Sequence, residues 1–226
     1  MAINPLKPEN NSRTLVIGKT GSGKTTFAFY LLSISRLDRC IVAIDFKRED
    51  LFKRLAHRTR AAQFVKPSWR PTRGARGLYI VQPRAQVDDA AIEELLWAIW
   101  RLKDRPLLFV DEAYLIPRNS PAFQAILTQG RSKGIQTIAL IQRPVYVSRF
   151  VMSEASNYAV FYLTHRDDRR TVAEFVPLPR DYENPEPYHC YWYRGGASDR
   201  VDYVLPSPQS DAILSSLTER LPAPLW

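Results

Sequence analysis

Three short stretches of the sequence contain residues whose types and spacing could handle a nucleoside triphosphate. The first, GKTGSGKTT at positions 18–26, follows the apolar run TLVI and precedes the apolar run FAFYLLSI. Its glycines would let backbone N–H groups approach phosphate oxygens because no Cβ stands in the way, and the positive end of the following helix would add to the attraction. The stretch therefore predicts a phosphate-binding loop between a strand and a helix.

This loop assigns a task to each residue type that it contains. Lys24 would reach the β- and γ-phosphates, and the Thr25 hydroxyl would bind Mg²⁺. We expect ATP and Mg²⁺ as cofactors, and the absence of an N-K-x-D motif disfavours a guanine nucleotide. The residues expected to bind the nucleotide are Gly18, Lys19, Thr20, Gly21, Ser22, Gly23, Lys24, Thr25 and Thr26.

The second stretch, LLFVDEAYLI at 107–116, supplies carboxylates. Asp111 and Glu112 follow four apolar residues typical of a buried strand, and ligands collect at the carboxyl ends of strands in open α/β sheets. Asp111 would hold Mg²⁺ through water, and Glu112 would polarise an attacking water. An adjacent pair of this kind favours hydrolysis over transfer of the phosphoryl group to a bound metabolite.

The third stretch, GRSKGIQTIALIQRP at 130–144, ends an apolar run on a glutamine. The amide of Gln142 can accept a hydrogen bond from water and donate one to phosphate, so it could sense whether the terminal phosphate bond is intact. A fourth strand end, in AIDFKRED at 43–50, contains Asp45 and Lys47. For these two residues, a solvated turn and a part in the site are equally compatible with the sequence.

Alternating apolar runs and helical patterns must position these residues. They predict a three-layer α/β fold with a mostly parallel central sheet and right-handed crossovers. The expected strands are Thr14–Ile17, Cys40–Phe46, Leu78–Gln82, Leu107–Asp111, Gln136–Gln142 and Tyr158–Leu163. The expected helices are Lys24–Ser35, Glu49–His57, Asp88–Lys103, Pro121–Ser132, Ser148–Glu154 and Asp167–Glu174.

Composition changes divide the chain into a core at 1–176 and a C-terminal part at 177–226. Residues 58–77, rich in Arg, Pro and Gly, are expected to form a basic insertion or loop within the core. The C-terminal part begins with a linker-like run. Its two aromatic and β-branched runs, separated by GGASD, predict a small β-hairpin, followed by a helix near 210–221 that packs on the core.

The charge of the chain is uneven. Its 226 residues have a net charge of +9, and the window between Asp50 and Asp88 contains cations but no acidic residue. Such clustering indicates a polyanionic partner, and Arg70, Arg73 and Arg76 are the candidate DNA contacts. No apolar stretch approaches the ~18 residues of a transmembrane helix, and we expect a soluble protein without an integral membrane segment.

Together with VAIDFK at 42–47 and VFYLTHRDDRRTVAEF at 160–175, the three stretches resemble the FtsK/HerA superfamily of P-loop motors. The resemblance implies a P-loop NTPase core of the RecA/ASCE-like type, with Walker A at 18–26, Walker B at 107–112 and the strand of Gln142 between the two Walker strands. It also implies a hexameric ring in which an arginine reaches the neighbouring site. Arg131 matches that position, with Arg169 or Arg170 in reserve. The family's usual Thr before the glutamine is Ile141 here.

Within this superfamily the chain resembles the minimal genome-packaging ATPases of tailless icosahedral viruses with an internal membrane, because it has neither membrane segments nor an added barrel. That resemblance implies translocation of double-stranded DNA into a preformed capsid, capsid or vertex proteins as partners, and location in the host cytoplasm or at the packaging vertex. Two alternatives stay open. One is a conjugative or filamentous-phage motor, and the other is a small-molecule kinase with an Arg-rich lid at 58–76.

Overall fold

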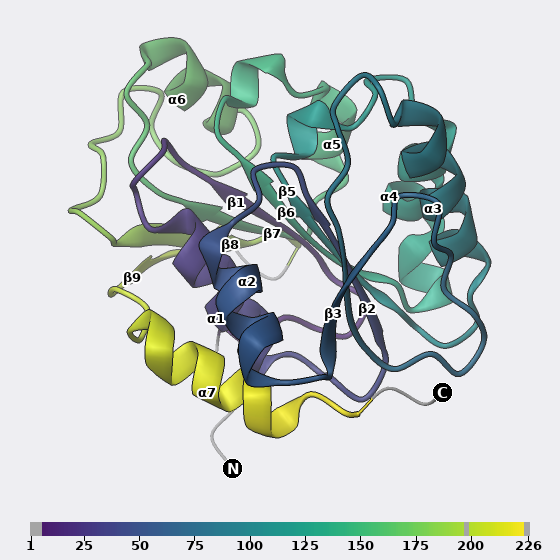
Figure 1. Ribbon diagram of the computed structural model, residues 1–226. Coiled ribbons are helices and arrows are strands. Elements are labelled where there is room, and N and C mark those ends of the chain that lie inside the picture. The colour runs from purple at the N-terminus through teal and green to yellow at the C-terminus, as the bar shows by residue number, and fades with distance from the viewer. Residues whose placement is uncertain (1–5, 197–198, 224–226) are drawn as a thin grey trace.

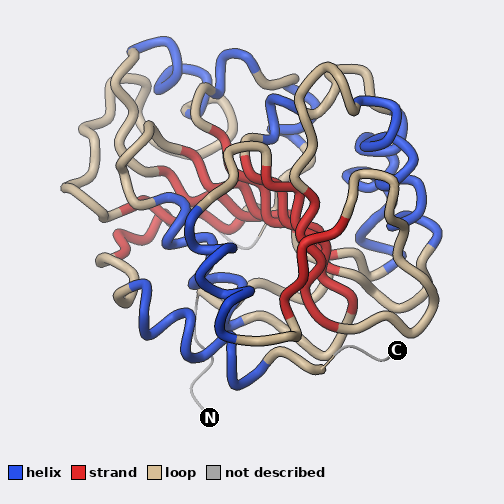
Figure 2. Tube along the Cα trace, viewed as in Figure 1, coloured by secondary structure: helices blue, strands red, loops and turns tan. Residues whose placement is uncertain are grey.

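A single nine-stranded sheet runs through the part of the chain that the computed structural model describes, residues 6–196 and 199–223 (Figure 2). The strand order is β3-β4-β2-β5-β6-β1-β7-β8-β9. Neighbours from β3 to β7 are parallel, whereas β8 and β9 are antiparallel. The strands are β1 Arg13–Ile17, β2 Cys40–Asp45, β3 Ala62–Val65, β4 Gly77–Val81, β5 Leu107–Asp111, β6 Gln136–Ile141, β7 Asn157–Val160, β8 Cys190–Arg194 and β9 Val201–Val204.

Helices cover both faces of this sheet, as the sequence predicted (Figure 1). One core packs α1, α2 and α7 against the sheet, and the core on the other face contains residues of α3, α4, α5 and α6. The helices are α1 Lys24–Ile34, α2 Asp50–Arg58, α3 Asp89–Arg101, α4 Pro121–Lys133, α5 Arg149–Ser153, α6 Arg166–Val172 and α7 Ser210–Arg220, with 3₁₀ turns η1 Ala113–Leu115 and η2 Pro144–Tyr146.

Buried aromatic rings fix α1 and α2 on the sheet. The ring centroid of Phe29 lies 4.7 Å from that of Phe52 on α2 and 5.6 Å from that of Phe109 on β5. All three side chains are fully buried. Burial of each contributes roughly 1.5–3 kcal/mol, and the cluster therefore holds the start of α1 in a fixed relation to the end of β5.

Helix α4 has a capped N-terminus and ends at a glycine just before β6. Its first turn is capped by Ser120, whose Oγ accepts a hydrogen bond from the Phe123 N–H, and Pro121 occupies the first helical position. At the other end Gly134 has a φ of +73°, and a Cβ there would lie 2.7 Å from the Arg105 side chain. This glycine therefore permits the sharp turn that starts β6.

Strand order brings the three predicted functional stretches to one edge. Strand β6 pairs with β5 on one side and with β1 on the other. Because all three strands are parallel, their carboxyl ends and the residues that follow them lie at the same edge of the sheet. The position implied by the family resemblance, with the glutamine strand between the two Walker strands, is confirmed.

The segment at 58–77 differs from the expected loop. Residues 62–65 form β3, which pairs in parallel with β4, and Trp69 stacks on Tyr79 with ring centroids 4.3 Å apart. The strand has only four residues and leaves Phe64 exposed. Its short apolar pattern lies between cations, prolines and glycines, and the local sequence therefore does not predict a strand there.

The C-terminal part continues the same sheet. Strand β8 pairs with β7, β9 pairs with β8, and α7 then packs beside α1 and α2 (Figure 1). Residues 197–198 of the predicted hairpin turn, and residues 1–5 and 224–226 at the two ends, lie outside the described residues. The division at 176 and 177 stays a prediction. Within residues 6–196 and 199–223, no helix has the length and apolar character needed to span a bilayer.

Candidate functional site

The loop at 18–25 is held by backbone hydrogen bonds to two neighbouring strand ends. The Gly18 N–H donates to the Ile141 carbonyl at 3.0 Å, and the Lys19 N–H donates to the Tyr162 carbonyl at 2.9 Å. A Cβ on Gly18 would lie 2.6 Å from the Cβ of Phe161, so only glycine fits there. The loop is thereby placed at the carboxyl ends of β1, β6 and β7.

Lys24 points into this edge from the first position of α1. Its side chain is almost fully buried, and its Nζ lies 4.0 Å from Oε1 of Glu112. Burial lowers the pKa of Lys24, and the nearby carboxylates of Asp111 and Glu49 partly oppose that shift. A cation held in this way is placed to attract an anionic ligand.

Asp111 and Glu112 end β5 as buried carboxylates, both 0% exposed. Among the described residues, neither oxygen of Asp111 has a hydrogen-bond partner. Burial raises the pKa of Asp111 to about 6, and the charges of Glu49 and Asp45 add to the rise while Lys47 and Lys24 oppose it. An unpartnered carboxylate of this kind is costly to bury unless a ligand compensates for it.

Lys47 lies just after the end of β2, the other neighbour of β5. Its ammonium forms an ion pair with Glu112, so that glutamate lies between two lysines. Burial and the charge of Lys24 both lower the pKa of Lys47. The sequence left Lys47 undecided, because nothing in its own strand shows that the strand's neighbour ends in a glutamate.

Asp45, the other undecided residue, holds local structure. Its Oδ1 accepts a hydrogen bond from the Glu49 N–H at 3.0 Å, and its Oδ2 accepts one from the Gln82 amide at 2.8 Å. These contacts fix the turn between β2 and α2. Asp45 therefore supports the loop that carries Lys47.

Gln142 follows β6 directly and reaches the phosphate loop, where its amide donates a hydrogen bond to the Thr20 hydroxyl. The turn after it is anchored by a buried carboxylate. The Arg143 guanidinium pairs with Asp168 on α6 at 2.8 Å, and the Val145 N–H donates to the same carboxylate at 3.2 Å. Gln142 thus lies between the loop and a turn that Asp168 fixes.

The candidate arginines do not join this cluster. Arg131 lies at the exposed end of α4, beside the amino ends of the strands, in a hollow that Asn157 and Arg194 also line. On α6, Arg169 donates to the Tyr182 carbonyl at 3.2 Å, and Arg170 lies 3.7 Å from Asp167. Arg131 therefore occupies the edge opposite to its own phosphate loop.

In the basic window, the residues between Asp50 and Asp88, some arginines already form ion pairs and others are exposed. Arg70 pairs with Glu94 at 2.7 Å and also donates to the carbonyls of Pro67 and Trp69. Arg73 and Arg76 are exposed. These two are the better placed of the predicted DNA contacts.

Hard oxygen donors are available for Mg²⁺. The unpartnered oxygens of Asp111 and the half-buried Thr25 hydroxyl suit an ion that takes one or two protein ligands and fills its shell with water and phosphate. Among the described residues, no group of three or more His, Cys, Asp and Glu is arranged to hold a metal ion. The residues present fit Mg²⁺ bound together with a nucleotide.

The raised pKa of Asp111 predicts a measurable effect on stability. The folded protein favours the protonated form, so this contribution to stability is present below about pH 4 and is lost as the pH rises through about 6. Without Mg²⁺, Asp111→Asn is expected to be more stable than wild type at pH 8 by roughly 2–3 kcal/mol, with little difference at pH 4. Urea denaturation at both pH values measures this, and an equal difference at both would contradict it.

Comparison with known proteins agrees with this geometry. No protein-family model matches the chain. It is 39% identical over 218 residues to DNA packaging ATPase P9 of Enterobacteria phage PRD1, covering 92% of both chains.

Solved structures show the same fold. The genome packaging NTPase B204 of Sulfolobus turreted icosahedral virus 2, in complex with AMPPCP, superposes with a TM-score of 0.68 at 18% identity, covering 89% of this chain and 100% of B204. The pCW3 conjugation coupling protein TcpA superposes with a TM-score of 0.62 at 12% identity, covering 94% of this chain and 66% of TcpA.

Fold and sequence motifs together define a P-loop NTPase with a mostly parallel sheet. Its similarity to P9 extends over nearly the whole length of both proteins. The chain belongs to the family of phage DNA packaging ATPases.

Proposed function

We propose that this chain hydrolyses ATP with Mg²⁺ at the carboxyl edge of its sheet and uses the energy to drive double-stranded DNA into a preformed viral capsid. The observation that carries the proposal is the convergence of Lys24, Glu112 and Gln142 on one phosphate loop. The relative P9 is named a DNA packaging ATPase, which supports the same cargo for this chain. Location in the host cytoplasm or at the packaging vertex, with capsid or vertex proteins as partners, belongs to the same proposal.

Each residue of the site has a distinct task in this proposal. Backbone N–H groups of residues 18–26 and the Lys24 ammonium bind the phosphates. Thr25 and Asp111 would hold Mg²⁺, which would supply positive charge to stabilise the transferring phosphoryl group. Glu112 accepts the proton of the attacking water. Gln142 orients that water and loses its partner when the γ-phosphate leaves.

Lys47 forms an ion pair with Glu112, the proposed general base. A lysine bound to the general base lowers its basicity, so Lys47 must turn toward the γ-phosphate before Glu112 can accept a proton. The two lysines thereby link the charge state of the base to occupation of the site.

In this proposal the subunits form a hexameric ring, and each subunit completes the site of its neighbour. Arg131 lies at the edge opposite to its own loop, so it can reach a γ-phosphate only in a neighbouring subunit. An arginine donated in trans stabilises the charge of the transition state and can contribute 10³–10⁵-fold in rate.

Mixing two inactive variants tests the trans arginine. Arg131→Ala is expected to bind ATP but to hydrolyse it at least about a hundredfold more slowly. Glu112→Gln is inactive for a different reason, and mixed rings contain interfaces with an intact Glu112 facing an intact Arg131. Turnover that rises above either variant alone is the expected result of a phosphate-release assay.

Lys133→Ala is the matched control, because Lys133 belongs to the same helix end but lies over the Trp100 ring at 3.8 Å. It should keep near wild-type turnover. If the mixture stays inactive while mass measurement shows mixed oligomers, Arg131 is not the trans residue.

The salt dependence of DNA binding tests the basic window. Replacing Arg70, Arg73 and Arg76 with alanine should lower the slope of log affinity against log salt by roughly 2. Each phosphate contact contributes about 0.9, and Arg73 and Arg76 are exposed whereas Arg70 pairs with Glu94. The control removes Arg58 and Arg84, two cations of the same window that already pair with Asp211 and Asp88. An unchanged slope in the triple variant, measured by fluorescence anisotropy, would exclude these contacts.

Two alternatives make different products or use different cargo. A conjugative motor shares this fold, as the likeness to TcpA illustrates, and would also be stimulated by DNA. A small-molecule kinase would transfer phosphate to a metabolite, with the Arg-rich segment as a lid. Release of all γ-phosphate as inorganic phosphate in the presence of DNA supports the motor, and a phosphorylated metabolite supports the kinase.

A further inference from the structure

A groove of about 540 Å³ lies directly beside the phosphate loop. Gly23 and Thr26, at the end of the loop and the start of α1, form one wall, and Arg54 of α2 contributes to it. The rest is built from distant parts of the chain, namely Tyr188 before β8 and the segment Pro206–Asp211, which follows β9 and includes the first residues of α7. Its volume falls in the range of about 300–1,000 Å³ that is typical of small-molecule sites.

Tyr188 is the unusual residue of this groove. Its ring packs on Gly23, where an added Cβ would lie 3.1 Å from Cδ1 of the tyrosine, yet the residue is 60% exposed. Its φ of +66° is in the left-handed region, which a bulky side chain rarely adopts. The turn around it is fixed by the His189 N–H, which donates to the Glu186 carbonyl at 3.0 Å. Such a backbone persists where the fold holds it, often at ligand clamps.

The phosphate loop determines where the remainder of a nucleotide must go. The terminal phosphates lie over the loop and Lys24, and the α-phosphate lies at the positive N-terminus of α1. The sugar and base therefore leave the loop past Gly23 and Thr26, which are the residues that open into this groove. An exposed aromatic ring at that point offers a flat surface for a base.

Polar groups are available for the edge of such a base. Ser207, Gln209 and Ser210 line the groove and offer hydroxyl and amide donors and acceptors. Arg54 and Asp211 pair at 2.7 Å, which ties α2 to the start of α7 across the groove. This ion pair thus holds the wall opposite the phosphate loop in place.

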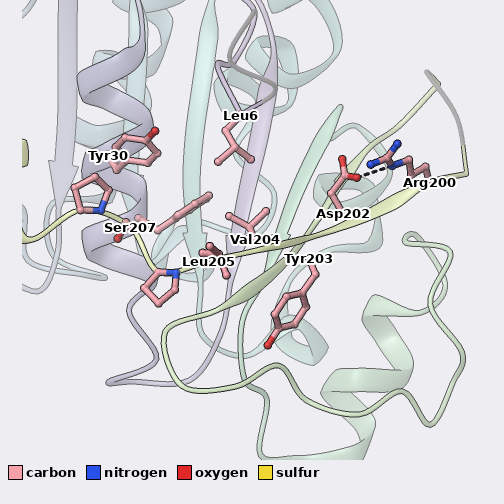
Figure 3. Close-up of a pocket in the computed structure, with 11 residues that line it drawn as sticks. Leu6, Tyr30, Arg200, Asp202, Tyr203, Val204, Leu205 and Ser207 are labelled. Atoms are coloured by element: carbon pink, nitrogen blue, oxygen red, sulfur yellow. Dashed lines mark hydrogen bonds and ion pairs between the residues drawn. The ribbon is translucent and has the colours of Figure 1, made fainter. Parts of the chain in front are cut away.

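A second hollow, of about 570 Å³, lies across the segment 206–208 (Figure 3). Tyr30, Leu205 and Ser207 surround it, and its lining on α1 begins at Phe27, beyond the residues that meet the phosphates. The position of the first groove next to Gly23 makes it the better match for a group attached to the α-phosphate. The second hollow therefore provides a control surface.

We propose that the groove between the phosphate loop and the segment 206–211 binds the base and ribose of the nucleotide, with the Tyr188 ring stacked on the base. This inference rests on the proposed phosphate site. It adds a residue from the C-terminal part of the chain to a site otherwise built from residues 18–142. The C-terminal part then completes nucleotide binding as well as extending the sheet.

The test compares a ligand that has a base with one that lacks it. Dissociation constants for ATPγS and inorganic tripolyphosphate are measured with Mg²⁺ by calorimetry on the full chain. Tyr188→Asn removes the ring and suits the left-handed backbone, so it should fold. We expect about tenfold weaker binding of ATPγS and unchanged binding of tripolyphosphate, whereas Tyr188→Phe should retain the affinity for ATPγS. Leu205→Ala, in the second hollow, should leave both constants unchanged.

Each other outcome has a defined meaning. Binding of ATPγS to Tyr188→Asn within twofold of wild type would overturn the inference, as would a parallel loss of tripolyphosphate, which would make Tyr188 a support for Gly23. Lys24→Ala separates the two proposals, because it should lose both ligands. If wild-type binding does not depend on Lys24, the phosphate site is wrong and the base site is rejected with it.

Discussion

Replacing Lys24 with alanine is expected to abolish ATP hydrolysis and to weaken nucleotide binding by at least about a hundredfold. The ammonium is buried at the first position of α1, where burial lowers its pKa and an anionic phosphate would reverse that cost. Charge-assisted hydrogen bonds to phosphate contribute about 1.5–3 kcal/mol each, and two of them account for this loss. Phosphate release and the dissociation constant of ATPγS measure both effects.

The fold should survive this change, because the alanine variant loses a desolvated cation rather than packing in the core. Thermal denaturation without nucleotide serves as the check. Lys66→Ala, which removes an exposed cation of the basic window, is the matched control and should keep the affinity for ATPγS. A Lys24→Ala protein that still turns over ATP at the wild-type rate would show that the loop at 18–26 is not the phosphate site.

Replacing Glu112 with glutamine is expected to lower kcat by about 10³-fold while ATP still binds. The substitution keeps the shape of the side chain but removes the group proposed to accept a proton, and general base catalysis contributes about 10²–10⁴-fold. It also removes the ion pair with Lys47, which frees that lysine for the γ-phosphate. ATP affinity should therefore be equal to that of wild type or higher, and the effect should fall on kcat rather than on KM.

Single-turnover hydrolysis distinguishes this expectation from slow product release. If Glu112→Gln hydrolyses bound ATP in one turnover as fast as wild type, Glu112 has no part in the chemical step. A loss of binding together with turnover would instead assign Glu112 a structural role at the end of β5.

Much of the fold could be predicted from the sequence, because most strands are continuous apolar runs bounded by recognisable helices. The run 107–111 has the same bounds in the structure, and α1 begins at Lys24 as the loop motif requires. Strand β3 was missed because four residues at a sheet edge carry little periodicity. Pairing with β4, rather than local pattern, makes that strand.

The sequence predicts candidate site residues only where they belong to a motif of consecutive residues. The loop, the carboxylate pair and Gln142 each belong to such a local motif. Lys47 gains its meaning from the adjacency of β2 and β5, and Tyr188 gains its meaning from contact with a glycine far away in the chain. Such contacts depend on strand order and on the return of the C-terminal part, which local patterns do not encode.

The proposed phosphate-binding residues and the proposed trans arginine lie at opposite edges of the sheet. The proposed phosphate-binding residues lie at the carboxyl ends of the strands, whereas Arg131 lies at the amino ends. A subunit on its own therefore lacks the arginine that its site would use. In the proposed ring, this arrangement would make hydrolysis in one subunit depend on Arg131 of its neighbour.

The rate of phosphate release by the wild-type chain, measured with and without double-stranded DNA, tests the central claim most directly. We predict that DNA raises the rate several-fold, that the rise disappears at high salt, and that inorganic phosphate is the product. A rate that is the same with and without DNA at low salt, under conditions where the protein binds that DNA, would contradict a DNA-translocating ATPase.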